Sequence, residues 1–194
     1  MASRLYTHAT PGRGSVYEKS TRFGMPVKTG PLLLLLASIA SPGAYADSFV
    51  GLFVVERSTN ANVIHYDAKI RDDGKLDPKN PVVAYWVMIT EGGRHESLSW
   101  IEREKAYGFT VSRNGQGGPY RMTLVSQKDR EILLLESDGT VRAETVIAGN
   151  RAYLHKIFVK TRRSGLLRTA DYFELFGTDV ATGADSYEKV VPGH

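Results

Sequence analysis

The 194-residue chain contains 25 basic and 21 acidic residues and no cysteine, which excludes disulfides, cysteine metal ligands and a cysteine-linked lipid anchor. Its formal charge of +4 comes from the first 46 residues, which carry five of the basic residues and one of the acidic ones, so residues 47–194 carry 20 of each. With a net charge of zero, residues 47–194 exert no long-range attraction on polyanions, and nucleic acid is not expected as a partner.

An apolar run at Leu32–Ala40 precedes Pro42, Gly43 and the small-x-small sequence Ala44-Tyr45-Ala46. The run is far shorter than the roughly 20 residues of a bilayer-spanning helix, but it fits the apolar part of a secretory signal. We therefore expect residues 1–46 to be a signal peptide that is cleaved after Ala46. The expected destination is the periplasm or the outside, without a transmembrane anchor.

The sequence leaves the start of this signal open between Met1 and Met25. More than twenty polar residues precede the apolar run, which is long for a signal peptide, whereas a start at Met25 gives ordinary proportions. Residues 1–24 are then either a loose extension or an incorrectly assigned start, and the signal proper is residues 25–46.

Residues 47–194 read as one domain of short strands separated by turn residues. The expected strands are Phe49–Val55, Asn62–Ile70, Val82–Ile89, Tyr120–Ser126, Glu131–Glu136, Thr140–Ala148, Tyr153–Thr161, Thr169–Phe176 and Tyr187–Val191. Gln127–Arg130 is expected as a turn, and Val82–Ile89, the most continuous apolar run, as a central strand covered on both faces. The pattern predicts an all-β fold, an antiparallel meander of about 8–10 strands. It closes as a β-sandwich or a small barrel, since an open sheet would expose its edges.

One short helix is expected near residues 99–107. Ser99-Trp100-Ile101-Glu102 is a capping box, in which the serine hydroxyl and the glutamate carboxylate satisfy each other's backbone amides. Gly108 is expected to end the helix in a left-handed conformation.

Several short motifs of the first half resemble one known family. They are Glu56-Arg57-Ser58, Asn60, Asn62-Val63, Tyr66-Asp67, Gly74-Lys75-Leu76-Asp77, Pro81, Tyr85-Trp86 and Tyr107-Gly108-Phe109. Together they resemble domain of unknown function 4833, a family of secreted bacterial proteins, over about Phe53 to Val190. The resemblance implies one exported domain. The family has no assigned activity, so it implies no site residue.

The strongest polar cluster lies where the first strand ends and the second begins. Arg57, Asn60, Asn62 and Tyr66 offer paired donors and acceptors for a carboxylate, a phosphate or a sugar, with Trp86 as an apolar wall. These residues are the candidate ligand-binding site. The alternative is structural, because asparagine is common in turns and aromatic side chains mostly pack in cores.

No metal or cofactor is expected. His65 and Asp67 share a strand face and His155 would have to complete a metal site, but their spacing matches no metal-binding motif. His155 is expected instead as a hydrogen-bonded core histidine. The acidic loop Asp72–Asp77 lacks the spacing of a calcium-binding loop.

A basic stretch near the end of the chain forms a second candidate surface. Lys156, Lys160 and Arg162 lie on an expected hairpin and would contact anionic lipid head groups or acidic glycans. The alternative is a solvated edge whose lysines prevent strand-to-strand aggregation.

The function that these features favour is an exported β-domain that binds a small ligand or a cell-envelope component. Catalysis is not expected, because the chain has no nucleophile-elbow motif, no cysteine and no phosphate-binding loop. One alternative is a hydrolase of envelope glycan or peptide that uses carboxylates such as Glu56 and Asp67. Another is a structural partner in an envelope assembly that presents the basic hairpin. The oligomeric state stays open.

Overall fold

A computed structural model describes residues 48–192, apart from residues 114, 116, 138 and 165–166. The expected signal peptide, with both of its candidate starts, lies outside the described residues. Within the described part of the chain, no helix has the length and the apolar character needed to cross a membrane.

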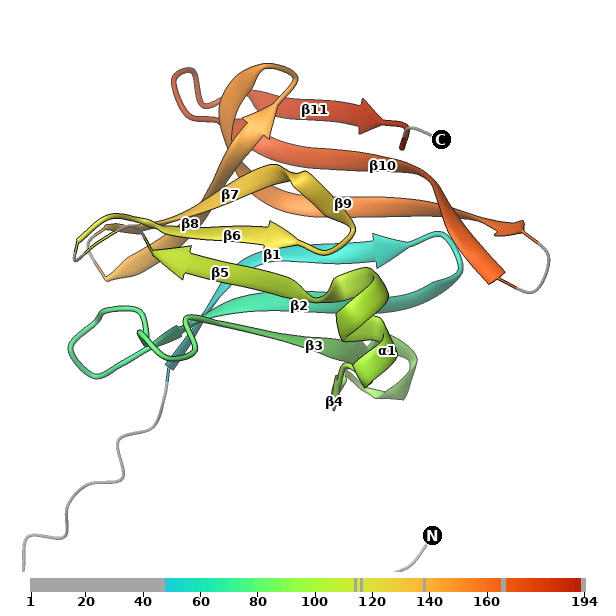
Figure 1. The fold of residues 1–194 in the computed structure, drawn as a ribbon, viewed down its shortest axis with the longest axis horizontal. Coiled ribbons are helices and arrows are strands. Elements are labelled where there is room, and N and C mark those ends of the chain that lie inside the picture. The colour runs from blue at the N-terminus through green and yellow to red at the C-terminus, as the bar shows by residue number, and fades with distance from the viewer. Residues whose placement is uncertain (1–47, 114, 116, 138, 165–166, 193–194) are drawn as a thin grey trace, which may run out of the picture. The chain divides into compact units, whose positions relative to one another are not determined.

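The described chain is mostly β-strand, with short helical turns (Figure 1). The strands are β1 (Ser48–Arg57), β2 (Asn60–Ile70), β3 (Val82–Met88), β4 (Arg94–Ser97), β5 (Phe109–Arg113), β6 (Tyr120–Leu124), β7 (Gln127–Ser137), β8 (Thr140–Ile147), β9 (Asn150–Ser164), β10 (Leu167–Asp179) and β11 (Asp185–Val190). The helical turns are η1 (Ile89–Glu91), α1 (Trp100–Glu102) and η2 (Arg103–Tyr107). The predicted all-β fold with one short helix near residues 99–107 is confirmed, and β4 and β5 are the strands that the sequence pattern missed.

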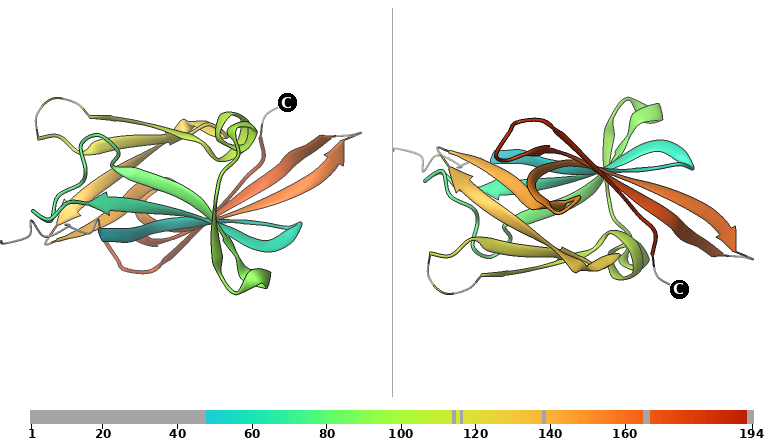
Figure 2. Two further views of the ribbon diagram at one scale, coloured as in Figure 1. Left: turned by 90° about the horizontal axis from the view of Figure 1, so that it is seen from below. Right: turned by 90° about the horizontal axis from the view of Figure 1, so that it is seen from above.

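All 11 strands form one sheet, which divides at β9. On one edge of β9, its first residues pair with β8 and its middle residues pair with β1, while β10 follows the other edge. The sheet therefore separates into two wings, β1–β4 and β5–β8, which curl toward each other as a half-barrel (Figure 2). The pairing of β1 with β9 is parallel. The sheet is thus mixed, whereas the sequence pattern predicted an antiparallel meander.

The hydrophobic core lies between the two wings. Alternate residues of each strand face inward, and they include Phe53, Val55, Ile64, Tyr66, Met122, Leu124, Ile132 and Leu134, all of which are buried. The ring of Tyr66 in β2 stacks on Phe53 at 4.6 Å between centroids and meets the edge of Phe109 in β5 at 6.0 Å. Tyr66 therefore connects the two wings at the centre of the core.

Two details of the expected strand pattern are wrong. In β3 only Val82 and Trp86 are buried, because this strand lies beside the edge strand β4 and its other face is half open to solvent. Residues 127–130, expected as a turn, form the beginning of β7, and the reversal takes place at Val125-Ser126.

The helical segment begins as predicted but ends differently. The Glu102 amide donates to Ser99 Oγ and the Ser99 amide donates to Glu102 Oε2, so the capping box is confirmed. Gly108 is extended, with φ −67° and ψ 168°, so the expected left-handed stop is wrong. A Cβ atom at this position would lie 1.7 Å from the carbonyl oxygen of Arg103. Glycine is therefore required here because the backbone of the π-helical turn η2 passes close by.

Gly108→Ala is expected to lower the free energy of unfolding by about 1–3 kcal/mol, because the added methyl group must push η2 away from β5. Urea denaturation measures this loss. Gly51→Ala is the matched control, since a Cβ there meets its nearest atom at an ordinary 3.8 Å. The control should stay within about 0.5 kcal/mol of the parent. Equal stability of the two variants would contradict the close approach.

Candidate functional site

A partly open cavity of about 200 Å³ lies between the wings, near the end of β1. Its walls come from β1, β2, β6, β7, β9 and β10, and η2 closes one side. In Figure 1 the helical segment lies across the end of the first wing, beside β5. We call this space the interwing cavity.

The interwing cavity changes from apolar to polar along its strands. On β1, inward-facing Val55 is 3% exposed, whereas Arg57 is half-buried and Thr59, just beyond the strand, is exposed. On β9, Ile157 is 1% exposed, and Thr161 is half-buried. Because residues two apart share a strand face, both strands place an apolar side chain deep in the cavity and polar ones toward its mouth.

Arg57 is the charged group of this cavity. Its guanidinium carbon lies 4.3 Å from the centre of the Trp86 ring, and its Nη1 donates to the Tyr107 hydroxyl at 3.2 Å. No carboxylate among the described residues forms an ion pair with Arg57 within 4.0 Å, and its Nε is buried without a hydrogen-bond partner. The guanidinium is thus held in place on one side and has donor capacity to spare.

Three buried polar atoms without a partner belong to residues that line the interwing cavity. They are Arg57 Nε, Gln127 Nε2 and Thr161 Oγ1. Most buried polar groups in folded proteins are hydrogen-bonded, so an unpaired group calls for an explanation. Because three such groups belong to residues that line one cavity, we take this cavity as the candidate binding site.

The helical segment is fixed to the sheet by a chain of polar contacts. The Trp86 indole donates to Glu102 Oε1 at 3.2 Å, and the Tyr66 hydroxyl donates to the Tyr107 carbonyl at 2.6 Å. Burial alone would raise the pKa of Glu102, but hydrogen bonds from Ser99 and Trp86 outweigh it and lower the pKa below its ordinary value. The Glu102 carboxylate is thus ionised at neutral pH and already engaged.

Burial raises the pKa of the Tyr66 hydroxyl, and it raises that of Tyr107 despite the opposing charge of Arg57. Both phenols therefore stay protonated at neutral pH. They act as neutral hydrogen-bonding groups beside the guanidinium.

The five candidate ligand-binding residues do not all meet in one place. Arg57 and Tyr66 line the interwing cavity, and Trp86 lies behind Arg57 without lining the cavity itself. Asn60 and Asn62 lie at the beginning of β2 and are not among the lining residues. Gln127 and Thr161, which the sequence did not single out, reach the cavity from β7 and β9, and no local motif marked them.

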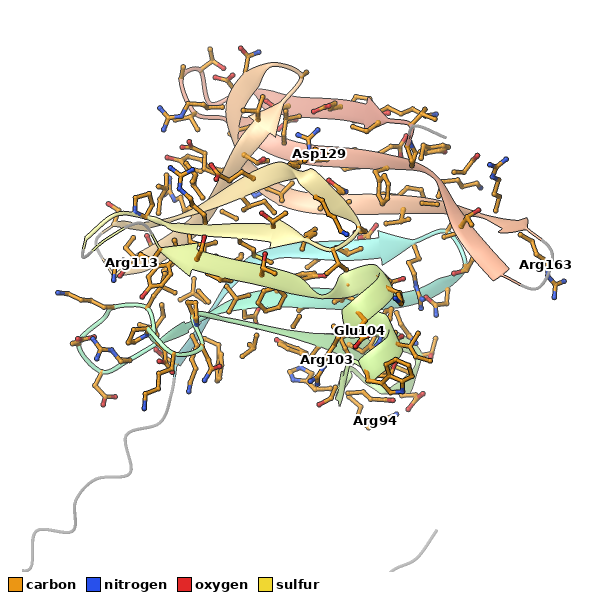
Figure 3. All side chains as sticks on the ribbon, in the orientation of Figure 1. Arg94, Arg103, Glu104, Arg113, Asp129 and Arg163 are labelled. Carbon is orange, nitrogen blue, oxygen red and sulfur yellow. The ribbon has the colours of Figure 1, made fainter. Side chains whose placement is uncertain are left out.

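The three residues of the basic hairpin are less free than their sequence indicates. Lys156 Nζ lies 3.5 Å from Glu56 and 4.6 Å from the Phe176 ring centre, and Arg162 lies 3.8 Å from Asp171. Lys160 is exposed. Figure 3 places Arg163 at the far tip of the β9–β10 hairpin. The basic stretch contains no acidic residue, but Glu56 of β1 and Asp171 of β10 lie beside it and partly neutralise its charge.

His65, Asp67 and His155 do not come together. Asp67 accepts a hydrogen bond from the Tyr85 hydroxyl at 2.5 Å, and His65 stacks on the same tyrosine. His155 is exposed and bonds to Thr178 Oγ1, so the expected core histidine is wrong. It occupies a bulge of β9, where the register with β10 shifts by one residue and turns the side chain outward. Among the described residues, no group of three potential metal ligands is found.

The two carboxylates of the hydrolase alternative lie apart. Asp67 pairs in register with Gly51, five residues before Glu56 on β1. At a rise of about 3.3 Å per residue, this places Glu56 roughly 16 Å farther along the strand. Glu56 also faces Lys156 and not the interwing cavity.

A wider and shallower groove of about 820 Å³ runs beside β7, β8 and β11. Its two arginines are already paired, since Arg130 contacts Glu188 at 2.8 Å and Arg151 contacts the buried Glu144 at 2.7 Å. The groove is larger than the interwing cavity, but carboxylates of the same chain already neutralise its arginines.

Glu102→Gln is expected to destabilise the protein by about 1 kcal/mol at pH 7, because a carboxamide cannot accept hydrogen bonds from both Ser99 and Trp86 as the carboxylate does. Since the folded-state pKa lies below the unfolded value, this stabilisation is complete above about pH 4.5 and is lost as the pH falls through the folded-state pKa. Thermal unfolding between pH 7 and pH 3 measures the difference.

Glu104 provides the matched control on the same helical segment, where it is exposed (Figure 3). Glu104→Gln should change the stability by less than about 0.5 kcal/mol at either pH. A Glu102→Gln deficit that persists unchanged at pH 3 would contradict a role for the ionised carboxylate.

A family model described as domain of unknown function (DUF4833) matches residues 53–189. Comparison with curated proteins and with solved structures finds no significant match. The matched segment begins in β1 and ends in β11, so it contains every residue that lines the interwing cavity. The resemblance seen in the sequence motifs is thereby confirmed, and the chain belongs to the DUF4833 family.

Proposed function

We propose that this protein is an exported domain that binds a small organic molecule in the interwing cavity. The observation that carries the proposal is the grouping of three unpaired buried polar atoms around a space with an apolar floor. Binding sites for small molecules commonly have this composition, with mostly apolar walls and a few convergent polar groups.

The size of the cavity limits the ligand. An apolar cavity of about 150 Å³ holds one benzene molecule, while pockets for drug-sized ligands begin near 300 Å³. At about 200 Å³, the interwing cavity fits a molecule somewhat larger than benzene. A nucleotide or a segment of a folded polypeptide is too large to enter the cavity.

Export is supported by the sequence alone. The apolar run, the helix-breaking Pro42-Gly43 and Ala44-Tyr45-Ala46 have the order of a secretory signal. The ligand is then a molecule of the periplasm or the surroundings.

The cavity is tested by filling it. Ala170 lines the interwing cavity, and Ala170→Leu occupies part of its volume without removing any polar group. In backbone-amide NMR with a library of small organic fragments, binders are expected to shift the amides of Arg57, Tyr107, Gln127 and Thr161 in the parent, and not in the variant.

Ala181→Leu is the control, because Ala181 is exposed in the turn between β10 and β11. This variant should bind the same fragments as the parent. Fragment shifts that cluster elsewhere, or that survive Ala170→Leu unchanged in a folded protein, would refute the interwing cavity as the site.

Export predicts a defined N-terminus. When the chain is expressed in a bacterium with a periplasm, the exported product should begin at Asp47 by N-terminal sequencing. Ala46→Lys should block cleavage, because signal peptidase requires a small residue at this position. A product that retains the apolar run, or that stays in the cytoplasm, would refute this prediction.

A further inference from the structure

The interwing cavity has a charge preference of its own. Its described lining residues include the cations Arg57 and Lys105 and no carboxylate. Glu102, the acid whose charge acts on Arg57, is engaged by Ser99 and Trp86 instead. A ligand that enters therefore meets a half-buried positive charge that nothing in the described chain neutralises directly. Burial of such a charge is costly, and an anionic ligand removes that cost.

The way in which Arg57 is held decides which anion fits. Trp86 covers one face of the guanidinium, and Tyr107 accepts a hydrogen bond from Nη1. The side-on edge formed by Nε and Nη2 has no hydrogen bond from the described residues. Two parallel N–H groups on one edge match the two oxygens of a planar carboxylate. A phosphate can use the same edge. Its dianion, however, brings two negative charges to a site with one half-buried cation, Arg57, since Lys105 is exposed at the rim.

The other two unpaired atoms extend the same recognition. Gln127 Nε2 is a donor, and Thr161 Oγ1 donates through its hydroxyl proton. A carboxylate has about four lone-pair sites, so it can accept from the Arg57 edge and still accept from Gln127 and Thr161. A neutral alcohol, with one oxygen, leaves at least one of these donors unpaired.

The floor of the cavity excludes a second charge. Val55, Leu124, Ile157 and Phe173 are all buried and apolar. A dicarboxylate would bury its second charge against these side chains without a partner. With a volume near 200 Å³, the floor accepts an apolar body of about six to eight carbon atoms.

We propose that the interwing cavity is specific for a small monocarboxylic acid with an apolar body. Its carboxylate bonds to the free edge of Arg57, to Gln127 and to Thr161, and its hydrocarbon part lies on the floor. This inference rests on the proposed function and adds the chemical class of the ligand.

The test compares probes that share a body and differ in the head group. Hexanoate and benzoate should bind by calorimetry to the exported protein, and 1-hexanol should bind about 10–100-fold more weakly. Hexylamine, hexyl phosphate and the dicarboxylate adipate should all bind more weakly than hexanoate.

Three substitutions assign the head group to its partners. Arg57→Gln should weaken hexanoate by at least about tenfold and leave 1-hexanol within about twofold. Lys105→Gln, the control for loss of one positive charge at the rim, should have a smaller effect. Thr161→Val and Gln127→Leu should weaken hexanoate while leaving the melting temperature equal or higher, because each removes an unpaired buried group. These two variants keep the test decisive if Arg57→Gln does not fold.

The outcomes separate the two proposals. Equal affinities for hexanoate and 1-hexanol, or tighter binding of hexyl phosphate, would overturn the carboxylate while the cavity stands as a binding site. If no probe binds and no fragment shifts the cavity amides, the proposed function itself fails. Loss of melting temperature in Thr161→Val and Gln127→Leu without loss of hexanoate affinity would return both residues to a structural role.

Discussion

The contact between the Arg57 guanidinium and the Trp86 ring is the interaction on which the candidate site depends. Strand alternation turns Arg57 inward after Val55, so its charge stands at the boundary of the core. The ring face of Trp86 attracts the cation by about 0.5–2 kcal/mol and covers one of its faces. Tyr107 accepts a hydrogen bond from Nη1, so the donors of Arg57 that stay available are Nε and Nη2. These two contacts hold the guanidinium of a normally flexible side chain in one orientation.

This contact also explains the unusual end of the helical segment. Tyr107 must reach Arg57 from one side while its carbonyl accepts from Tyr66 on the other. The π-helical turn η2 adds the extra backbone needed to present both groups, and such turns occur frequently at functional sites. The same turn brings the Arg103 carbonyl against residue 108, where only glycine fits. One requirement, the position of Tyr107, accounts for the turn, the glycine and the capping box that anchors the start of the segment.

The sequence predicted what depends on neighbours in the chain and missed what depends on distant pairing. Strand alternation identified most of the sheet, and Ser99 and Glu102 identified the start of the helix, because both signals are local. Arg57 and Tyr66 stood out because they lie in one polar cluster. Asn62 is level with the cavity, because it lies on β2 between Asn60, the register partner of Arg57, and Ile64, the partner of Val55. It does not line the cavity, because the register of β1 and β2 shifts at this point and interrupts the simple alternation that the sequence suggests.

Gln127 and Thr161 were beyond the reach of such patterns. Thr161 lines the same cavity as Arg57 only because β9 returns to pair in parallel with β1, where Val159 is the register partner of Arg57, about a hundred positions away in the chain. Gln127 reaches the cavity only because the chain reverses at Val125-Ser126. The polar sequence Gln127–Arg130 resembles a turn, so the sequence does not predict that Gln127 is half-buried at the start of β7. Likewise, β3 is apolar on both faces, which imitates a central strand although it lies next to an edge.

The energetic cost of the site is itself an argument for a ligand. Of the four buried side-chain atoms without a partner among the described residues, three belong to the interwing cavity. The fourth, Arg121 Nε, belongs to a guanidinium that already binds Glu131. An unpaired buried group costs about 1–3 kcal/mol, whereas a domain is stable by only about 5–15 kcal/mol in total. Random imperfections of packing would scatter through the core, but three of these four atoms belong to residues that line one cavity. A molecule that supplies their partners would recover this free energy on binding, so such a ligand would make the protein more stable than it is with an empty cavity.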